Sequence, residues 1–217
     1  MGILALFRRQ GLTPDRLLDE SLGNFELPSF PGTAIATLRL LRDPNATPQQ
    51  LARSIEQNPA LLVRVLRTVN SAVYGMRRRI ASARQASVLL GRSELEAIVV
   101  SVCVKNSIPS IDAPGYDAAR FWLAASRRAA LARGLARRLH PETQAECFTA
   151  GLLQDMAVPL LAMARPKVYG PLLLHWHETP EARLDHLEEL EFGWNHGSVG
   201  AGMAERWGLP ENLALGI

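Results

Sequence analysis

The sequence is short of the residues that would stabilise a small protein covalently or hold it in a membrane. Only two of its 217 residues are cysteines, Cys103 and Cys147, too few for a disulfide framework and without the C-x-x-C spacing of a metal site. No uncharged apolar run approaches the ~20 residues that span a bilayer. The first residues also lack the charge order and cleavage site of a secretory signal. These absences favour a cytoplasmic protein with two reduced, buried thiols and no membrane partner.

Strand-like alternation between hairpin turns is missing too, and the apolar residues recur with a helical period. Residues 93–106 carry an apolar face at intervals of three and four, and Ser93 is the expected N-cap of that helix. Residues 122–139 repeat this spacing mainly with alanines, which predicts close packing against a neighbouring helix. With 47% hydrophobic residues, the chain is able to bury a large core. The sequence therefore predicts an all-α fold of roughly ten or more helices.

Turn signals divide the helical pattern into two closely packed lobes. Thr47 caps a predicted helix that begins at Pro48, and a further helix begins at Pro59 and ends at Asn70. A loop with the sequence SIPSIDAPGYD then marks the internal boundary. The predicted division is an N-terminal helical extension at 1–24, a first lobe at 25–108 and a second lobe at 116–217.

Charge is distributed unevenly along the chain. Residues 1–140 hold 20 Lys/Arg against 10 Asp/Glu, a net charge of +10, whereas residues 141–217 hold 4 against 11, a net charge of −7. Arg77, Arg78 and Arg79 form a dense basic cluster that could bind an anion or face a protein partner. The cluster lacks the interleaved aromatic residues of a single-strand binder. A solvated or partner-facing surface is therefore favoured over nucleic-acid binding.

Seven segments follow one another in the order of a known family's motifs. They are LPSFP at 27–31, RDPNAT at 42–47, NPALLVRVLRTVNSAVYG at 58–75, RRIASARQASVLLG at 78–91, FW at 121–122, AGLLQDM at 150–156 and HGSVGAGMAERWGLPE at 196–211. Over residues 25–217 the chain resembles the HDOD domain, the HD-related output domain of bacterial signalling proteins. The resemblance implies an all-helical fold related to the HD phosphohydrolases, a regulatory role, and further helix after Ile217, so that the chain would be truncated.

The resemblance also locates the place where an HD phosphohydrolase would bind metal. Such an enzyme needs an early histidine, an adjacent His-Asp pair and a late aspartate, because several ligands must converge on the ion that activates water. The pair is Gln154-Asp155 here, and a neutral glutamine amide is a weak ligand. The residues at the early position are Leu123, Ala124 and Ala125, which offer no ligand. We therefore expect no metal, no other cofactor and no catalysis.

Two interpretations of Asp155 stay open. An aspartate on an apolar helix can be satisfied by an arginine or by backbone donors without any ligand. Alternatively, Gln154 and Asp155 line a vestigial pocket that still takes a nucleotide-type molecule, with His196 joining it if that residue faces the pair. Asn195 is the expected N-cap of the helix that His196 opens, and Pro159 is expected to kink or end the helix just beyond the pair.

The favoured function is a non-enzymatic regulatory module of bacterial signal transduction that contacts a signalling protein partner, with a small nucleotide as an optional ligand. One alternative is a metal-dependent HD-type phosphohydrolase of nucleotides or cyclic dinucleotides. Its metal site would have to be rebuilt from other residues, but His175 and His177 face apart on a helix, and the acidic residues 186–191 are interpreted as a solvated helix. A second alternative is a nucleic-acid-binding regulator that uses the arginine cluster.

Overall fold

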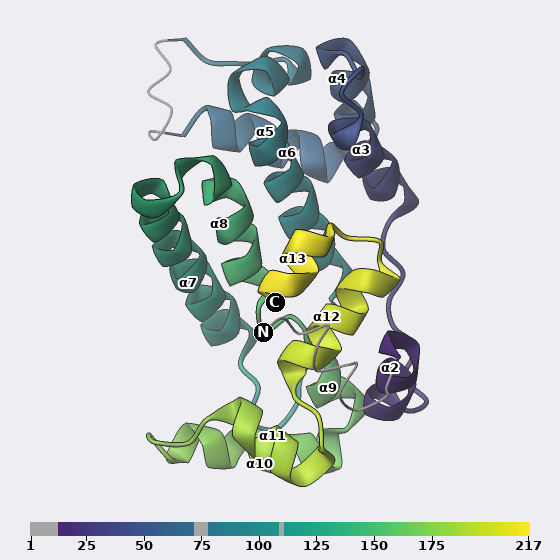
Figure 1. Cartoon of the computed structure of the whole chain (residues 1–217), viewed down its shortest axis with the longest axis vertical. Helices are drawn as coiled ribbons and strands as arrows, with labels where there is room; N and C mark the ends of the chain where they lie inside the picture. The colour runs from purple at the N-terminus through teal and green to yellow at the C-terminus, as the bar shows by residue number, and fades with distance from the viewer. Residues whose placement is uncertain (1–12, 72–77, 109–110) are drawn as a thin grey trace. The chain divides into compact units, whose positions relative to one another are not determined.

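The computed structural model describes residues 13–71, 78–108 and 111–217, and every regular element in these ranges is a helix (Figure 1). The only strand-like pairing among them is an isolated bridge between Ala113 and Tyr116. The helices are α2 (Pro14–Leu22), α3 (Gly32–Arg42), α4 (Pro48–Glu56), α5 (Pro59–Val69), α6 (Ala83–Ser107), α7 (Ala118–Leu139), a 3₁₀ turn (Pro141–Thr143), α8 (Gln144–Leu153), α9 (Ala157–Ala164), α10 (Pro166–Glu178), α11 (Leu184–Phe192), α12 (His196–Arg206) and α13 (Glu211–Gly216). The predicted all-α fold is confirmed.

The chain forms two compact units. One contains residues 30–107, and the other combines residues 1–29, of which 13–29 are described, with residues 108–217. Helix α2 packs against α12 in the second unit, where Arg206 Nη2 lies 2.7 Å from Asp15 Oδ1. The division therefore differs from the sequential one expected from the sequence: the described part of the N-terminal extension belongs to the C-terminal half.

In the unit of residues 30–107, local sequence signals decide where the helices begin. Thr47 Oγ1 accepts a hydrogen bond from Gln50 N, and Gln50 Oε1 accepts one from Thr47 N, which makes a capping box at the start of α4. The side chain of Asn58 caps α5. The predicted cap at Ser93 is wrong, because α6 runs through that residue. The backbone leaves the helix earlier, at Gly91, whose φ of +74° favours glycine.

Two polar side chains of the same unit bind distant parts of its backbone. The Asn70 amide nitrogen donates to the carbonyls of Leu66 and Ile80, and its amide oxygen accepts a hydrogen bond from Ile80 N. The guanidinium of Arg92 donates to carbonyl oxygens at and beyond the C-terminal end of α3, where the helix has none of its own donors left. These carbonyls belong to Leu40, Leu41, Asp43, Pro44 and Ala46.

In the other unit, α7 and α8 approach each other through small residues. Ala125 and Ala129 of α7 are buried, and a Cβ atom added to Gly151 of α8 would lie 3.2 Å from Ala129 Cα. A larger side chain at position 151 would push the helices apart. The predicted alanine packing face is confirmed, although Leu139 at its end is 69% exposed.

The helical path breaks between α8 and α9. Helix α8 ends at Leu153 and α9 begins at Ala157, so Asp155 lies in the turn between them. The expected kink at Pro159 is wrong, because the break comes before it. Pro159 lies in the first turn of α9, where a backbone N–H has no partner within the helix.

The stretch that contains this turn, Pro141–Ala164, has the length and mean hydropathy (1.4) of a membrane-crossing helix. However, 56% of its most apolar window is buried, and the helix is interrupted at residues 154–156. Core helices have the same composition, so the feature is weak evidence for a membrane span.

Candidate functional site

Asp155 is the centre of a polar cluster within the unit that contains α7 to α13. Arg128 of α7 donates from Nη1 to Asp155 Oδ2 at 2.7 Å and from Nε to the carbonyl of Gly151 at 2.8 Å. The guanidinium therefore binds both a carbonyl in the last turn of α8, whose oxygen has a partial negative charge, and the carboxylate that follows it. The two side chains are 32% and 26% exposed, respectively. In the structure, then, Asp155 is satisfied by an arginine.

His196 lies beside the second oxygen of the same carboxylate. Its Nε2 is 3.5 Å from Asp155 Oδ1, and its Nδ1 is 2.6 Å from Glu188 Oε2. Glu188 Oε2 also accepts a hydrogen bond from His196 N at 2.8 Å, and the hydroxyl of Tyr169 donates to Glu188 Oε1. Asn195 caps α12 as expected, so the start of this helix places the imidazole between two acidic side chains.

Burial makes these charges depend on one another. Glu188 and Tyr169 are fully buried, and the His196 side chain is 13% exposed. Burial lowers the pKa of His196, but its hydrogen bonds to Asp155 and Glu188 outweigh that effect and raise the pKa to about 9. Near neutral pH the cluster thus holds two cations, Arg128 and His196, against two acidic side chains.

Burial and neighbouring charges also shift the pKa values of Asp155 and Tyr169. Burial raises the pKa of Asp155, but the hydrogen bond to His196 and the charge of Arg128 reverse this, so its pKa lies below the ordinary value. Burial and the neighbouring Glu188 raise the pKa of Tyr169 well above its ordinary value. The phenol therefore stays protonated and remains a hydrogen-bond donor.

Only part of the predicted pocket comes together. Asp155 and His196 are adjacent, which was the condition set for a role of His196 in the pocket. Gln154 is exposed, and no hydrogen bond among the described residues links it to the cluster. The pocket predicted from Gln154, Asp155 and His196 is in the structure a cluster of Asp155 and His196 with partners from other helices.

The cation next to Asp155 comes from α7, but not from the positions singled out in the sequence. Leu123 and Ala124 are exposed and Ala125 is buried against its neighbours. Arg128 follows Ala124 by about one helical turn and reaches Asp155. No sequence signal distinguished Arg128 from the other arginines of α7.

Glu188 is the residue whose role the sequence most misrepresented. Residues 186–191 were interpreted as a solvated helix. This is wrong at Glu188, which is fully buried, whereas Leu190 is 86% exposed. A usable signal was present, because Glu188 follows the buried Leu184 by four residues and so shares its helix face. His175 and His177 are exposed and lie outside the cluster.

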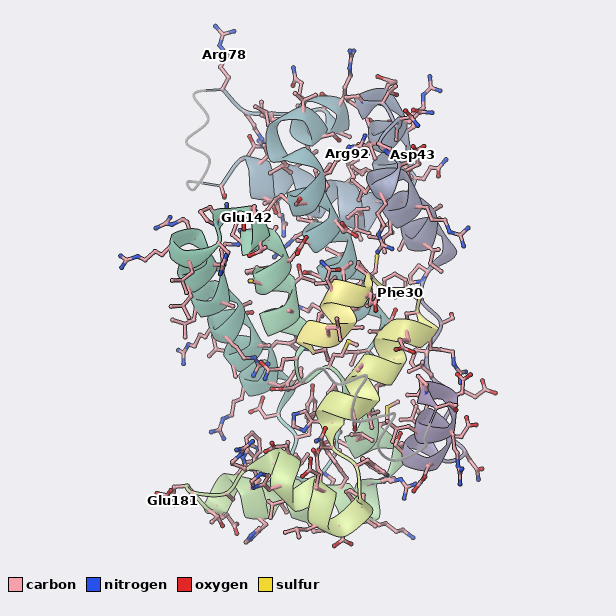
Figure 2. All side chains as sticks on the ribbon, in the orientation of Figure 1. Phe30, Asp43, Arg78, Arg92, Glu142 and Glu181 are labelled. Carbon is pink, nitrogen blue, oxygen red and sulfur yellow. The ribbon has the colours of Figure 1, made fainter. Side chains whose placement is uncertain are left out.

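The predicted basic surface is described only in part. Arg77 lies outside the described residues, and Arg78 and Arg79 are exposed. Figure 2 shows the Arg78 side chain extending away from the ribbon. Arg92, which is near them in sequence, donates its guanidinium hydrogen bonds to carbonyl oxygens at and beyond the end of α3. It lies beside Asp43 in the same view.

The cluster does not fit the divalent metal that the HD relationship implies. A hydrolytic centre uses about three protein ligands and keeps one position open for water. Within the described ranges, no group of three or more His, Cys, Asp or Glu residues is arranged to hold a metal ion. Asp155 is shared with a guanidinium, and both oxygens of Glu188 accept hydrogen bonds from protein donors.

Comparison with known proteins identifies the family. The model of the HDOD domain matches residues 27–217. This chain belongs to the HDOD domain family. The match runs through both units of the structure and includes every residue of the Asp155 cluster.

Individual relatives establish the HDOD fold without establishing an activity. A protein from Shewanella amazonensis SB2B, provisionally named a phosphohydrolase, has a TM-score of 0.73 and 24% identity over 91% of this chain and 68% of its own. A provisionally named signal transduction protein from Marinobacter aquaeolei VT8 has a TM-score of 0.73 and 23% identity over 93% of this chain and 48% of its own. An uncharacterised protein of Treponema pallidum (strain Nichols) is 26% identical over 190 residues. This match covers 86% of the HDOD chain but only 36% of the relative's length.

Proposed function

We propose that this HDOD domain is a non-enzymatic regulatory module of signal transduction, which acts by contact with a signalling protein partner in the cytoplasm. The observation that supports it is the pairing of Asp155 with the Arg128 guanidinium at 2.7 Å. In an enzyme of the HD type, the carboxylate at this position would bind a divalent ion that activates water. An arginine supplies positive charge there but no exchangeable position for water, because it has no open coordination site.

The remaining polar groups support the same proposal. Within the cluster, two cations face two acidic side chains, and the cluster draws its members from α7, α10, α11, α12 and the turn after α8. Such a network ties helices together, which is the usual role of a satisfied buried polar network. A module that signals by contact needs helices held in a defined arrangement, whereas it does not need a reactive centre.

The provisional names of the two structural relatives point to different functions, signal transduction and phosphohydrolysis. The pairing of Arg128 with Asp155 favours the first for this chain. A nucleotide that binds without being hydrolysed is compatible with the proposal, since a regulatory module can respond to a ligand that shifts its conformational equilibrium.

A turnover assay tests the proposal. The purified chain is incubated with nucleoside triphosphates and with a cyclic dinucleotide in the presence of Mn²⁺ or Mg²⁺. We expect no release of phosphate or linear product above that of the Asp155→Ala variant. Metal-dependent turnover that is abolished by Asp155→Ala and retained by Asp112→Ala, an exposed aspartate of the same unit, would overturn the proposal.

A further inference from the structure

Helix α7 exposes a row of leucines on the side that does not pack against α8. The two helices lie side by side (Figure 1), and the buried alanines of α7 face α8. Leu131, Leu135 and Leu139 follow one another at intervals of four residues and are 69%, 63% and 69% exposed. This leucine row extends over about 12 Å of the helix. Single exposed leucines are ordinary on a folded protein, whereas a continuous row is typical of a binding surface.

The same helix carries positive charge and no negative charge. It contains six arginines and no aspartate or glutamate. Two of the arginines interact with α8 or the turn after it: Arg128 binds Asp155, and the Arg133 guanidinium lies 4.3 Å from the centre of the Phe148 ring. The other four are exposed and have no ion-pair partner among the described residues; they are Arg120, Arg127, Arg137 and Arg138.

The stability of α7 does not require all four of these charges. Arg137 and Arg138 lie in the last turn, where the helix dipole favours a cation. Arg120 lies in the first turn, where the dipole disfavours one, and Arg127 lies in the middle of the helix. Arg127 precedes Leu131 by four residues, and Arg138 follows Leu135 by three, so both arginines flank the leucine row.

We propose that the leucine row and its flanking Arg127 and Arg138 bind an acidic amphipathic helix of the signalling partner. Apolar side chains of that helix would pack against the leucines, and its carboxylates would pair with the two arginines. In paired helices, charges beside an apolar seam select the partner in this way. The inference rests on the proposed function, because it names the chemistry of the partner that a contact-dependent regulator needs.

Two other occupants fit this face less well. In a symmetric dimer the same patch of both copies meets itself, so arginines would approach arginines and repel each other. A helix that lies on a membrane needs a wide apolar face, but the wide apolar face of α7 is already packed against α8. Arginines also interrupt the face that is left exposed.

The probe for the test is a fluorescein-labelled synthetic peptide as long as α7, 22 residues, with leucines along one helical face and glutamates on the others. A second peptide has lysines in place of the glutamates. A third has the composition of the first, with its leucines dispersed around the helix. Binding to the unmodified chain and to folded variants is measured by fluorescence anisotropy at two salt concentrations, with circular dichroism to verify folding.

The leucine row is tested by the double variant Leu131→Gln/Leu135→Gln. Its matched control is Leu174→Gln/Leu190→Gln, at exposed leucines on other helices of the same unit. We expect the acidic amphipathic peptide to bind the unmodified chain at least about tenfold more tightly than it binds Leu131→Gln/Leu135→Gln, because two buried leucine contacts are lost. The control should bind within about twofold of the unmodified chain.

The flanking charges are tested by Arg127→Gln/Arg138→Gln. Its matched control, Arg16→Gln/Lys167→Gln, removes two exposed charges from other helices of the same unit. We expect Arg127→Gln/Arg138→Gln to weaken binding about three- to tenfold and to reduce its dependence on salt, since exposed ion pairs are modest and screened. The lysine peptide and the peptide with dispersed leucines should bind at least about tenfold more weakly than the first.

Four outcomes would overturn the inference. One is an acidic amphipathic peptide that does not bind, or binds no better than the other two peptides. Another is equal binding by Leu131→Gln/Leu135→Gln and its control. The third is leucine-dependent binding to anionic phosphatidylglycerol vesicles without binding of the peptide, which would make the face a membrane surface. The fourth is a dimer in analytical ultracentrifugation that Leu131→Gln/Leu135→Gln dissociates, which would make it an interface between copies.

Failure of this test is distinguishable from failure of the proposed function. Metal-dependent turnover would overturn the regulatory function, whereas none of the present measurements detects turnover. Loss of the α7 surface alone would leave a regulatory module whose partner binds a different face.

Discussion

The two units of this HDOD domain differ in how they satisfy polar groups away from solvent. In the unit of residues 30–107, the Thr37 and Ser54 hydroxyls lie 2.7 Å apart, and Asn70 and Arg92 bind backbone carbonyls. In the other unit, His196 and Asp155 are ionisable groups that face each other. The first arrangement supplements helix ends and loops with neutral or permanently charged groups. The second depends on charge balance, so loss of one member leaves another charge uncompensated.

The largest expected effect is the loss of a member of the charged cluster. His196→Ala leaves Glu188, which is fully buried, without its imidazole partner. It should lower the free energy of unfolding by about 3–5 kcal/mol, as expected when a buried charge loses its partner. Urea unfolding monitored by circular dichroism measures the change. His175→Ala, at an exposed histidine of the same unit, should change the value by less than about 0.5 kcal/mol. Equal effects of the two substitutions would contradict the charge-balance account.

The next effect is a dependence on pH between 6.5 and 9, which follows from the raised pKa of His196 in the charged cluster. The pKa of His196 is about 9 in the folded chain against 6.5 for an ordinary histidine. Because the folded pKa is raised, the stabilisation is complete below about pH 6.5 and is lost as the pH rises through 9. A difference of this size corresponds to about 3 kcal/mol. The gap in unfolding free energy between the unmodified chain and His196→Gln should therefore narrow between pH 6.5 and 9. A gap that is constant over this interval would show that the imidazole is not held as a cation.

A smaller, pH-independent effect is expected in the other unit. Asn70→Ala removes three hydrogen bonds to the backbone of Leu66 and Ile80. The loss should be about 1–3 kcal/mol, because the part-buried N–H and C=O of Ile80 lose the Asn70 side chain as their partner. The loss in unfolding free energy caused by Asn70→Ala should be the same throughout the pH interval in which the difference between the unmodified chain and His196→Gln becomes smaller. Asn45→Ala, at an exposed asparagine of the same unit, is the control and should have little effect. If the loss caused by Asn70→Ala also became smaller over this pH interval, the distinction between the two units would not hold.

The smallest effect concerns the neutral hydroxyl pair. Thr37→Val leaves the Ser54 hydroxyl, in a side chain that is largely buried, without its partner and should cost about 1–2 kcal/mol. The double variant Thr37→Val/Ser54→Ala should be less destabilised than the sum of the two single variants, since both partners are then absent. A double-variant cycle by urea unfolding measures this coupling. Strict additivity would indicate that the two hydroxyls do not depend on each other.

Much of the fold was accessible from local sequence. Thr47 and Asn195 were expected to cap helices, and each does so. The helix expected to begin at Pro59 also begins there. The effect of a cap is local, because a capping side chain bonds to a backbone group two or three residues away. The Ser93 cap failed for a related reason. Gly91 can adopt a positive φ that interrupts the helix before Ser93, and the apolar period of residues 93–106 does not reveal it.

The candidate site was accessible only in part. Asp155 and His196 were identified from their polar character in apolar or helix-opening segments, and the structure brings them to 3.5 Å. Arg128 and Glu188 were missed as partners, because they lie on separate helices, 27 residues before Asp155 and 8 residues before His196 in the sequence. Helical periodicity predicts which face of a helix is buried, but it does not say which helix covers that face.

The sequence by itself determined that the chain is helical, where several of its helices begin, and that it carries the motifs of the HDOD family. These properties depend on residues close together in the chain or on motif order. Only the tertiary structure decided which charge neutralises Asp155. Several arginines of α7 have the same chemistry and differ only in direction, and the close approach of α7 to α8 through Ala129 and Gly151 is what brings Arg128 to that carboxylate. That approach depends on packing between whole helices, which no single segment of sequence specifies.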